Sequence, residues 1–254
     1  MSLKKNILYS GFLTTSLYIF QFITYPYVAR VLGVTNIGIC NYVQSIVQYF
    51  MLFSMMGVTS LGIREIAACG KDYIKRDTVF SKIFLLTNIT TALVVLCYIC
   101  CIEFIPKLTP YRTLLYVGTL QIVFNTLTIE WFFRGIENFK YITIRTFIIR
   151  SAYVIAIFLF IHSPSDYGKY FTITTLTYVL NGIINLLFSR KIVKFQWQKL
   201  SSLRCYIKPM LSLGVLAILG AMYTSLNIIY LGFITNATEA VSYTHLRAHE
   251  TLSD

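Results

Sequence analysis

The sequence predicts an all-α fold, a polytopic transmembrane helical bundle of about seven spans. Hydrophobic residues make up 56% of the chain and charged residues only 13%, whereas soluble domains carry about 25% charged residues. Apolar runs of about 20 residues, the length that crosses the hydrocarbon core, recur along the chain. The basic residues, which give a net charge of +12, gather between these runs. They therefore indicate membrane topology and not nucleic-acid binding.

The apolar runs place the spans in order. We expect them at about 7–29, 37–61, 83–105, 113–133, 147–162, 170–188 and 209–233. Pro26 predicts a kink in the first span, because proline removes a backbone donor. In the second, Gly57 and Gly62 permit close helix approach. Pro106 follows the third span, and Pro209 opens the seventh at a favoured first helical position.

The lysines and arginines alternate between the two ends of the predicted spans. The side that holds the N-terminus carries 17 of them, Arg145 and Arg150 included, and the other side carries four before the C-terminal tail: Arg30, Lys107, Arg112 and Lys169. Positive charge is enriched in cytoplasmic loops. We therefore expect a cytoplasmic N-terminus.

The fourth span leads into a stretch that combines polar and charged residues. Gln121, Asn125 and Thr128 recur at i, i+4 and i+7 and so share one helix face. Glu130 and Arg134 have the spacing and order of a helical ion pair. Such a polar face lines a wet cavity or joins helices through hydrogen bonds, and this span alone does not decide between the two.

Cysteine and histidine chemistry adds little. Cys97, Cys100 and Cys101 lie within an apolar span without a partner histidine, so packing explains them better than a metal does. We find no phosphate-binding loop, dinucleotide fingerprint or metal motif, and the short outer loops hold no acid–base constellation. We expect no catalytic residues, no metal and no cofactor.

The last part of the chain differs in composition from the rest. After Val241 the hydrophobicity falls and two histidines, His245 and His249, appear. We expect 242–254 to be an artefactual tail and the natural sequence to be cut near Val241. The domain prediction is then a six-span N-terminal lobe at 1–208, a seventh span at 209–241 that starts a second lobe, and the tail.

Three stretches carry a family resemblance. Pro26–Gly33 (PYVARVLG), Gly62–Ala67 (GIREIA) and Glu130–Glu137 (EWFFRGIE) resemble the oligosaccharide flippases, the polysaccharide-biosynthesis exporters related to multidrug and toxin extruders. The resemblance implies two lobes of twelve to fourteen spans in all, of which this chain holds the first lobe and one span more. It also implies a polyprenyl-pyrophosphate-linked oligosaccharide of the O-antigen or capsule type as cargo, moved to the outer leaflet of the cytoplasmic membrane of a bacterium.

Such a cargo needs cations for its pyrophosphate and amides for its sugars. The candidate substrate-binding residues are Arg30, Arg64, Arg134, Asn41, Gln44, Gln48, Gln121 and Asn125. For each arginine the competing interpretation is a topological residue that contacts lipid headgroups. Arg30 stands out because positive charge is scarce on its side, so we expect Arg30→Ala to abolish export. The resemblance further implies glycosyltransferases and a polymerase of the same pathway as partners.

Three alternatives remain open at this stage. One is an ion-coupled multidrug extruder of the same fold, although no acidic residue precedes Glu65. Another is a membrane glycan polymerase or ligase, although its outer loops would need catalytic groups. The third is an inactive fragment, which follows if the chain is truncated.

Overall fold

The computed structural model describes residues 3–234, with side chains for residues 5–220, and this part of the chain is mainly helical and contains no strand. The predicted all-α multi-pass bundle is confirmed. Five helices in the described part are long and apolar enough to cross a membrane. The elements are α1 Leu3–Ser54, α2 Val58–Ala67, α3 Tyr73–Phe104, η1 Pro106–Tyr111, α4 Arg112–Leu127, α5 Glu130–Gly135, α6 Phe139–Phe160, η2 Pro164–Asp166, α7 Tyr167–Ser189, η3 Leu200–Leu203 and α8 Arg204–Ile234.

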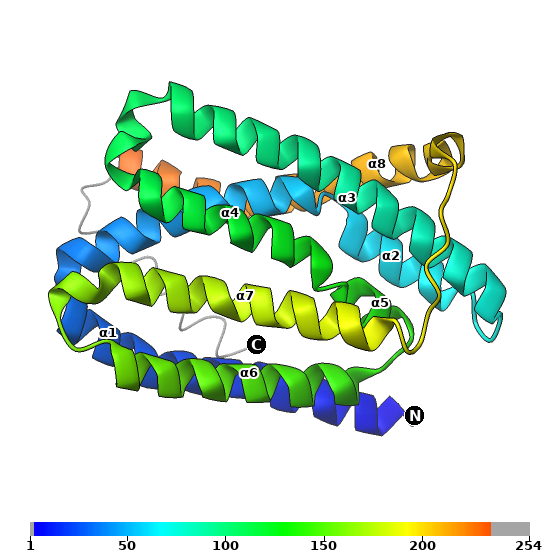
Figure 1. Cartoon of the computed structure of the whole chain (residues 1–254), viewed down its shortest axis with the longest axis horizontal. Coiled ribbons are helices and arrows are strands. Elements are labelled where there is room, and N and C mark those ends of the chain that lie inside the picture. The colour runs from blue at the N-terminus through cyan, green and yellow to red at the C-terminus, as the bar shows by residue number, and fades with distance from the viewer. Residues whose placement is uncertain (1–2, 235–254) are drawn as a thin grey trace.

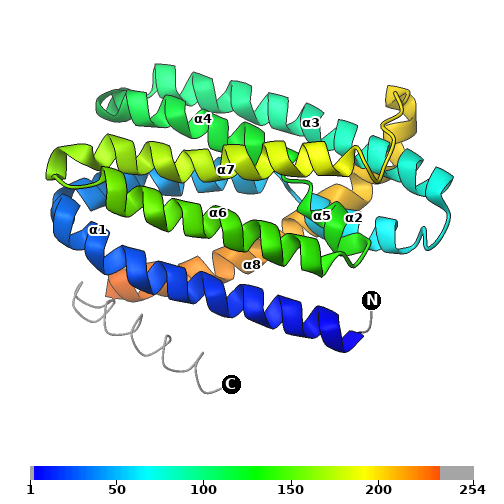
Figure 2. The same ribbon diagram turned by 60° about the horizontal axis from the view of Figure 1, so that its bottom comes forward.

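The long helices lie side by side, and those that follow one another along the chain run in opposite directions (Figure 1). Neighbours in space can therefore be parallel, as α1 is with α6 and α4 with α7. The first arm of α1 contacts α6, α6 contacts α7, α7 contacts α4, and α4 contacts α3. Helix α1 bends at Gly33, whose φ of 75° and ψ of 165° leave the helical region. Its second arm therefore returns toward the other end of the bundle, behind α7 in the view of Figure 2, and α1 also contacts α3 and α4. The bend, η1 and η2 lie at one end of the bundle, and the N-terminus, α2, α5 and the start of α8 lie at the other.

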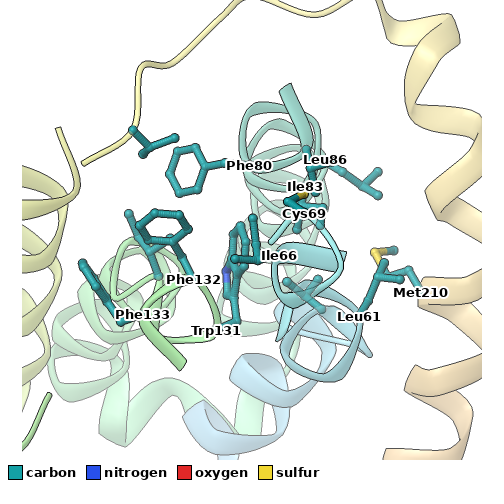
Figure 3. Packing of buried hydrophobic residues seen from close by; sticks show 14 of the residues in the cluster. Leu61, Ile66, Cys69, Phe80, Ile83, Leu86, Trp131, Phe132, Phe133 and Met210 are labelled. Carbon is teal, nitrogen blue, oxygen red and sulfur yellow. The ribbon is translucent and has the colours of Figure 1, made fainter. Parts of the chain in front are cut away.

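An aromatic core joins α2, α3 and α5 at the end that holds the N-terminus (Figure 3). Trp131, Phe132 and Phe133 of α5 are at most 1% exposed. A Cβ added at Gly62 of α2 would lie 2.4 Å from the Trp131 ring, so only glycine admits this contact. Two of the stretches that carry the family resemblance thus pack directly against each other.

The predicted second and fourth spans are wrong as continuous helices. The second is interrupted at Gly57, which adopts a left-handed φ of 69° and whose added Cβ would lie 2.1 Å from the Met210 carbonyl oxygen of α8. The fourth ends at Leu127, because Ile129 adopts a left-handed φ of 47° before α5 begins. In both places the chain turns where it meets another helix.

Two further boundaries correct the prediction. Helix α6 begins at Phe139 and not at 147, so Arg145 also lies inside it. Pro209 lies inside α8, which begins at Arg204, and not at its first position. The predicted tail at 242–254 lies outside the described residues.

Candidate functional site

A cavity of about 530 Å³ opens between the two arms of α1 and helices α6 and α7. Its lining combines tyrosines, amides, hydroxyls and one arginine. The lining residues are Thr14, Leu17, Tyr18, Phe20, Gln21, Thr24, Tyr25, Val28, Asn41, Arg150, Tyr153 and Tyr170. We call this space the tyrosine cavity.

Hydrogen bonds join α1 to α6 on both sides of the tyrosine cavity. Toward the N-terminal end, the Thr143 hydroxyl donates to the Tyr9 carbonyl at 3.1 Å. Toward the bend, the Tyr27 hydroxyl donates to the Ile161 carbonyl at 2.8 Å. These bonds and the packing around them fix the two helices, while the residues between them leave space.

Arg150 carries the positive charge of the tyrosine cavity. It lies near the middle of α6, about 15 Å from either helix end at the rise of an α-helix. Its guanidinium carbon is 6.0 Å from the centre of the Tyr153 ring. No carboxylate in the described part of the chain forms an ion pair with it. A charged side chain at membrane depth is costly, and such residues commonly mark substrate pathways.

The amides of the tyrosine cavity are also free to bind. Neither the Gln21 nor the Asn41 side chain makes a hydrogen bond to another side chain within residues 5–220. Four tyrosines accompany these amides. Aromatic rings offer apolar faces and hydroxyls, and amides offer both donors and acceptors. This lining can bind a polar ligand that carries a negative charge.

The structure separates the predicted amides into two groups. Asn41 lines the cavity, and Gln48 is exposed on the same arm of α1. Gln44 instead pairs with Gln121 through two amide hydrogen bonds of 3.0 and 3.2 Å, and Gln121 donates to Thr175 at 2.8 Å. Gln121 is fully buried. These two glutamines therefore join helices, the second interpretation that the sequence left open.

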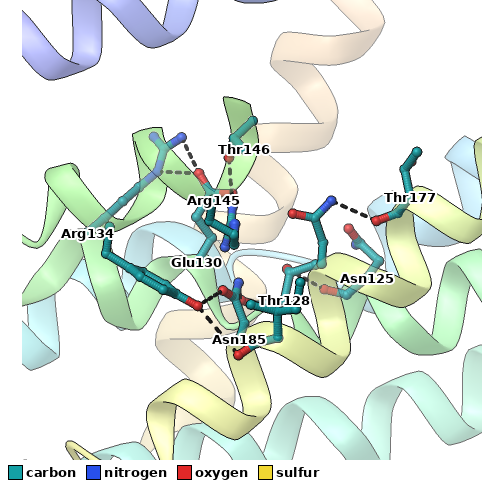
Figure 4. A network of polar contacts seen from close by, with 11 residues as sticks. Asn125, Thr128, Glu130, Arg134, Arg145, Thr146, Thr177 and Asn185 are labelled. Atoms are coloured by element: carbon teal, nitrogen blue, oxygen red, sulfur yellow. Dashed lines mark hydrogen bonds and ion pairs between the residues drawn. The ribbon is translucent and has the colours of Figure 1, made fainter. Parts of the chain in front are cut away.

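The expected ion pair between Glu130 and Arg134 is present at the N-terminal end of the bundle (Figure 4). The Arg134 guanidinium lies 2.6 Å from the Glu130 carboxylate, and Arg145 lies 3.8 Å from its other oxygen. Arg145 is 6% exposed. Nearby, Asn185 accepts a hydrogen bond from Tyr141 at 2.9 Å and donates to the Thr128 carbonyl. The network ties α4, α5, α6 and α7 together away from the tyrosine cavity.

The remaining predicted residues do not converge on one site. Arg30 is exposed near the bend of α1. Arg64 is exposed and pairs with its neighbour Glu65 at 3.1 Å. Asn125 is half-buried, and its backbone carbonyl accepts a hydrogen bond from Thr128. The structure therefore places Asn41 at the tyrosine cavity, and the three predicted arginines elsewhere.

Arg150 and the cavity tyrosines were not predicted as site residues from the sequence. The count of basic residues places Arg150 on the N-terminal side, although it also falls within the expected span at 147–162. The available signal was its context, since it stands between apolar residues on both sides within an expected span. The tyrosines gave no such signal, because tyrosine is also common at membrane interfaces.

The fold, with five described helices long and apolar enough to cross a membrane, defines a multi-pass membrane protein. Comparison of the sequence with known families narrows this class further. Residues 3–249 match the family described as "Polysaccharide biosynthesis protein". The chain belongs to that family, which confirms the resemblance in the three stretches.

Two curated relatives carry the printed name "Putative O-antigen transporter". The one from Escherichia coli (strain K12) is 24% identical over 187 residues, which cover 73% of this chain and 45% of the relative. The one from Shigella dysenteriae is 27% identical over 195 residues, which cover 74% of this chain and 47% of the relative. The chain thus spans about half the length of the curated relatives it matches. No solved structure matches it.

Proposed function

We propose that the chain forms the N-terminal lobe of a transporter that moves a polyprenyl-pyrophosphate-linked oligosaccharide from the cytoplasmic to the outer leaflet. The tyrosine cavity carries the proposal. It combines a positive charge at membrane depth with amides and tyrosines that face open space. A pyrophosphate-linked sugar presents the complementary groups, an anion and many hydroxyls, and cannot cross about 30 Å of hydrocarbon unaided.

Within this proposal Arg150 binds the anionic group, and Gln21 and Asn41 bind sugar hydroxyls. Arginine suits phosphate because its planar group donates two parallel hydrogen bonds. Two lobes that rock around such a site would expose it to each side of the membrane in turn. The transporter acts without catalysis, and the pathway's glycosyltransferases and polymerase act before and after it.

The charge of the tyrosine cavity favours this cargo over that of a cation-coupled drug extruder. Its described lining includes Arg150 and no carboxylate. A cationic drug would meet a like charge there, which weakens binding at membrane depth. The proposal also places the basic end of the bundle, and with it the N-terminus, in the cytoplasm of a bacterium, as the distribution of lysine and arginine favours.

The test is export of surface polysaccharide in a bacterium that lacks its own O-antigen transporter. The strain should express the longest natural reading frame that contains this chain, together with the glycan genes of the same locus. We expect surface polysaccharide to return and the lipid-linked precursor to fall in the inner leaflet. Accumulation of unexported precursor, despite normal amounts of the protein in the membrane, would overturn the proposal.

A further inference from the structure

An extended segment joins the end of α7 to the start of α8 and crosses α3 on the way (Figure 1). We call residues 190–203 the crossing segment. It contains Arg190, Lys191, Lys194 and Lys199 and no acidic residue. It also lies at the end of the bundle where most lysines and arginines gather, and therefore near one surface of the membrane.

The crossing segment is held firmly against α3. Arg76 of α3 donates from Nη2 to the Ile192 carbonyl at 2.8 Å. The Gln196 backbone N–H donates to the Ser81 hydroxyl at 2.9 Å. The Phe195 ring contacts Phe84 of α3 edge to face, with 5.9 Å between ring centres. With its backbone fixed at these points, the segment presents its other side chains in a defined direction.

Two large apolar side chains of the crossing segment are exposed. Trp197 is 85% exposed and Leu200 is 71% exposed, and Lys194 and Lys199 flank Trp197 in the sequence. Tryptophan prefers the level of the lipid headgroups, and lysine next to it is typical of segments that bind anionic membrane surfaces. Neither property stabilises a loop that points into water.

We propose that the crossing segment binds the headgroups of anionic phospholipids. Lys194 and Lys199 contact the lipid phosphates, Trp197 lies at headgroup level, and Leu200 reaches the start of the acyl chains. The apolar and basic groups suit a phospholipid surface, whereas an acidic protein partner would leave Trp197 and Leu200 without a complementary surface. None of these contacts involves the tyrosine cavity, so lipid binding by the crossing segment is independent of the cargo.

The chain offers a direct probe, because it contains two tryptophans and Trp131 is only 1% exposed. The protein is placed in nanodiscs with brominated phosphatidylglycerol or brominated phosphatidylcholine, whose bromine atoms quench nearby tryptophan. The signal of Trp197 is the difference between the unchanged chain and Trp197→Phe. We expect phosphatidylglycerol to quench this signal at a lower mole fraction than phosphatidylcholine does. Equal quenching by both lipids, or none by either, would overturn the proposal.

A pair of charge variants tests the lysines. Lys194→Gln with Lys199→Gln should raise the phosphatidylglycerol fraction needed for half-maximal quenching, since each lysine near an anionic surface contributes roughly fivefold in binding. Lys5→Gln with Lys140→Gln removes the same charge from exposed positions outside the segment and should leave that fraction unchanged. An equal shift in both variants would show that net charge alone attracts the lipid, and the assigned contacts would be wrong.

Discussion

The α2–α5 contact and the tyrosine cavity lie in one bundle but use their residues in opposite ways. At the α2–α5 contact, glycine and aromatic rings fill the space completely. At the tyrosine cavity, large side chains line a space of about 530 Å³ that stays open. The polar groups differ in the same way, since Gln44 and Gln121 bond to each other while Gln21 and Asn41 face open space. Residue type alone therefore does not identify the site.

The α2–α5 contact should lose the most stability when a side chain in it is enlarged. We expect Gly62→Ala to leave little folded protein, because its Cβ would lie 2.4 Å from a Trp131 ring that cannot move aside. Overpacking of a core costs about 1–3 kcal/mol, more than the alanine gains in helix propensity. The measurement is the folded yield and Tm in detergent.

Gly11 provides the matched control, since nothing lies within 4 Å of a Cβ added there. Gly11→Ala should keep or slightly raise Tm. If Gly62→Ala unfolds at the temperature of the unchanged chain, the tight contact between α2 and α5 does not hold the bundle together.

Substitutions at the tyrosine cavity should lower polysaccharide export more than they lower stability. We expect Arg150→Gln to lower export of surface polysaccharide tenfold or more, because the cavity loses its charge, while Tm changes little. Arg150→Lys keeps the charge without the planar donors and should retain part of the export. Both are measured by polysaccharide export in the full-length protein, with membrane protein levels as reference.

Arg30→Ala is the companion variant, because the sequence favoured Arg30 and the structure places it outside the tyrosine cavity. If Arg30→Ala stops export and Arg150→Gln does not, the tyrosine cavity is not the site. If Arg150→Gln lowers the amount of folded protein instead, Arg150 has a structural role.

A smaller effect should distinguish Gln121, which bonds to other side chains, from Gln21, which faces the tyrosine cavity. Gln121→Leu should lower stability by about 0.6–2 kcal/mol, the range for hydrogen bonds between transmembrane helices, because Gln44 and Thr175 lose their partner. Gln21→Leu, at the open cavity, should leave Tm within error and weaken export. Thermal unfolding in detergent measures the loss of stability in Gln121→Leu. An equal loss in Gln21→Leu would contradict the distinction between a structural glutamine and a cavity glutamine.

The sequence predicted the all-α multi-pass class, because long apolar runs show directly in it, and it predicted the family from three short stretches. It predicted individual side-chain roles less well. Around the axis of an ideal helix, the side chains of Asn41 and Gln48 point in directions about 20° apart, whereas Gln44 points about 60° away from Asn41. This difference suffices to turn Gln44 toward α4. The breaks at Gly57 and Ile129 also arise from contacts with other helices, which a single helical pattern does not contain.

The smallest expected effect lies outside both regions, in the turn before α7. The Lys169 ammonium, 2.7 Å from the Asp166 carboxylate, and the backbone N–H groups of His162 and Ser163 hold the pKa of Asp166 well below its ordinary value. Because this pKa is lower in the folded chain, the carboxylate stabilises the turn above about pH 4, the ordinary pKa of aspartate. That contribution fades as the pH falls from there toward the folded pKa. Asp166→Asn should lower Tm at pH 7 by less than Gln121→Leu does, and the difference from the unchanged chain should shrink at pH 3. A difference that stays constant between pH 7 and pH 3 would show that Asp166 acts through its shape and not through its charge.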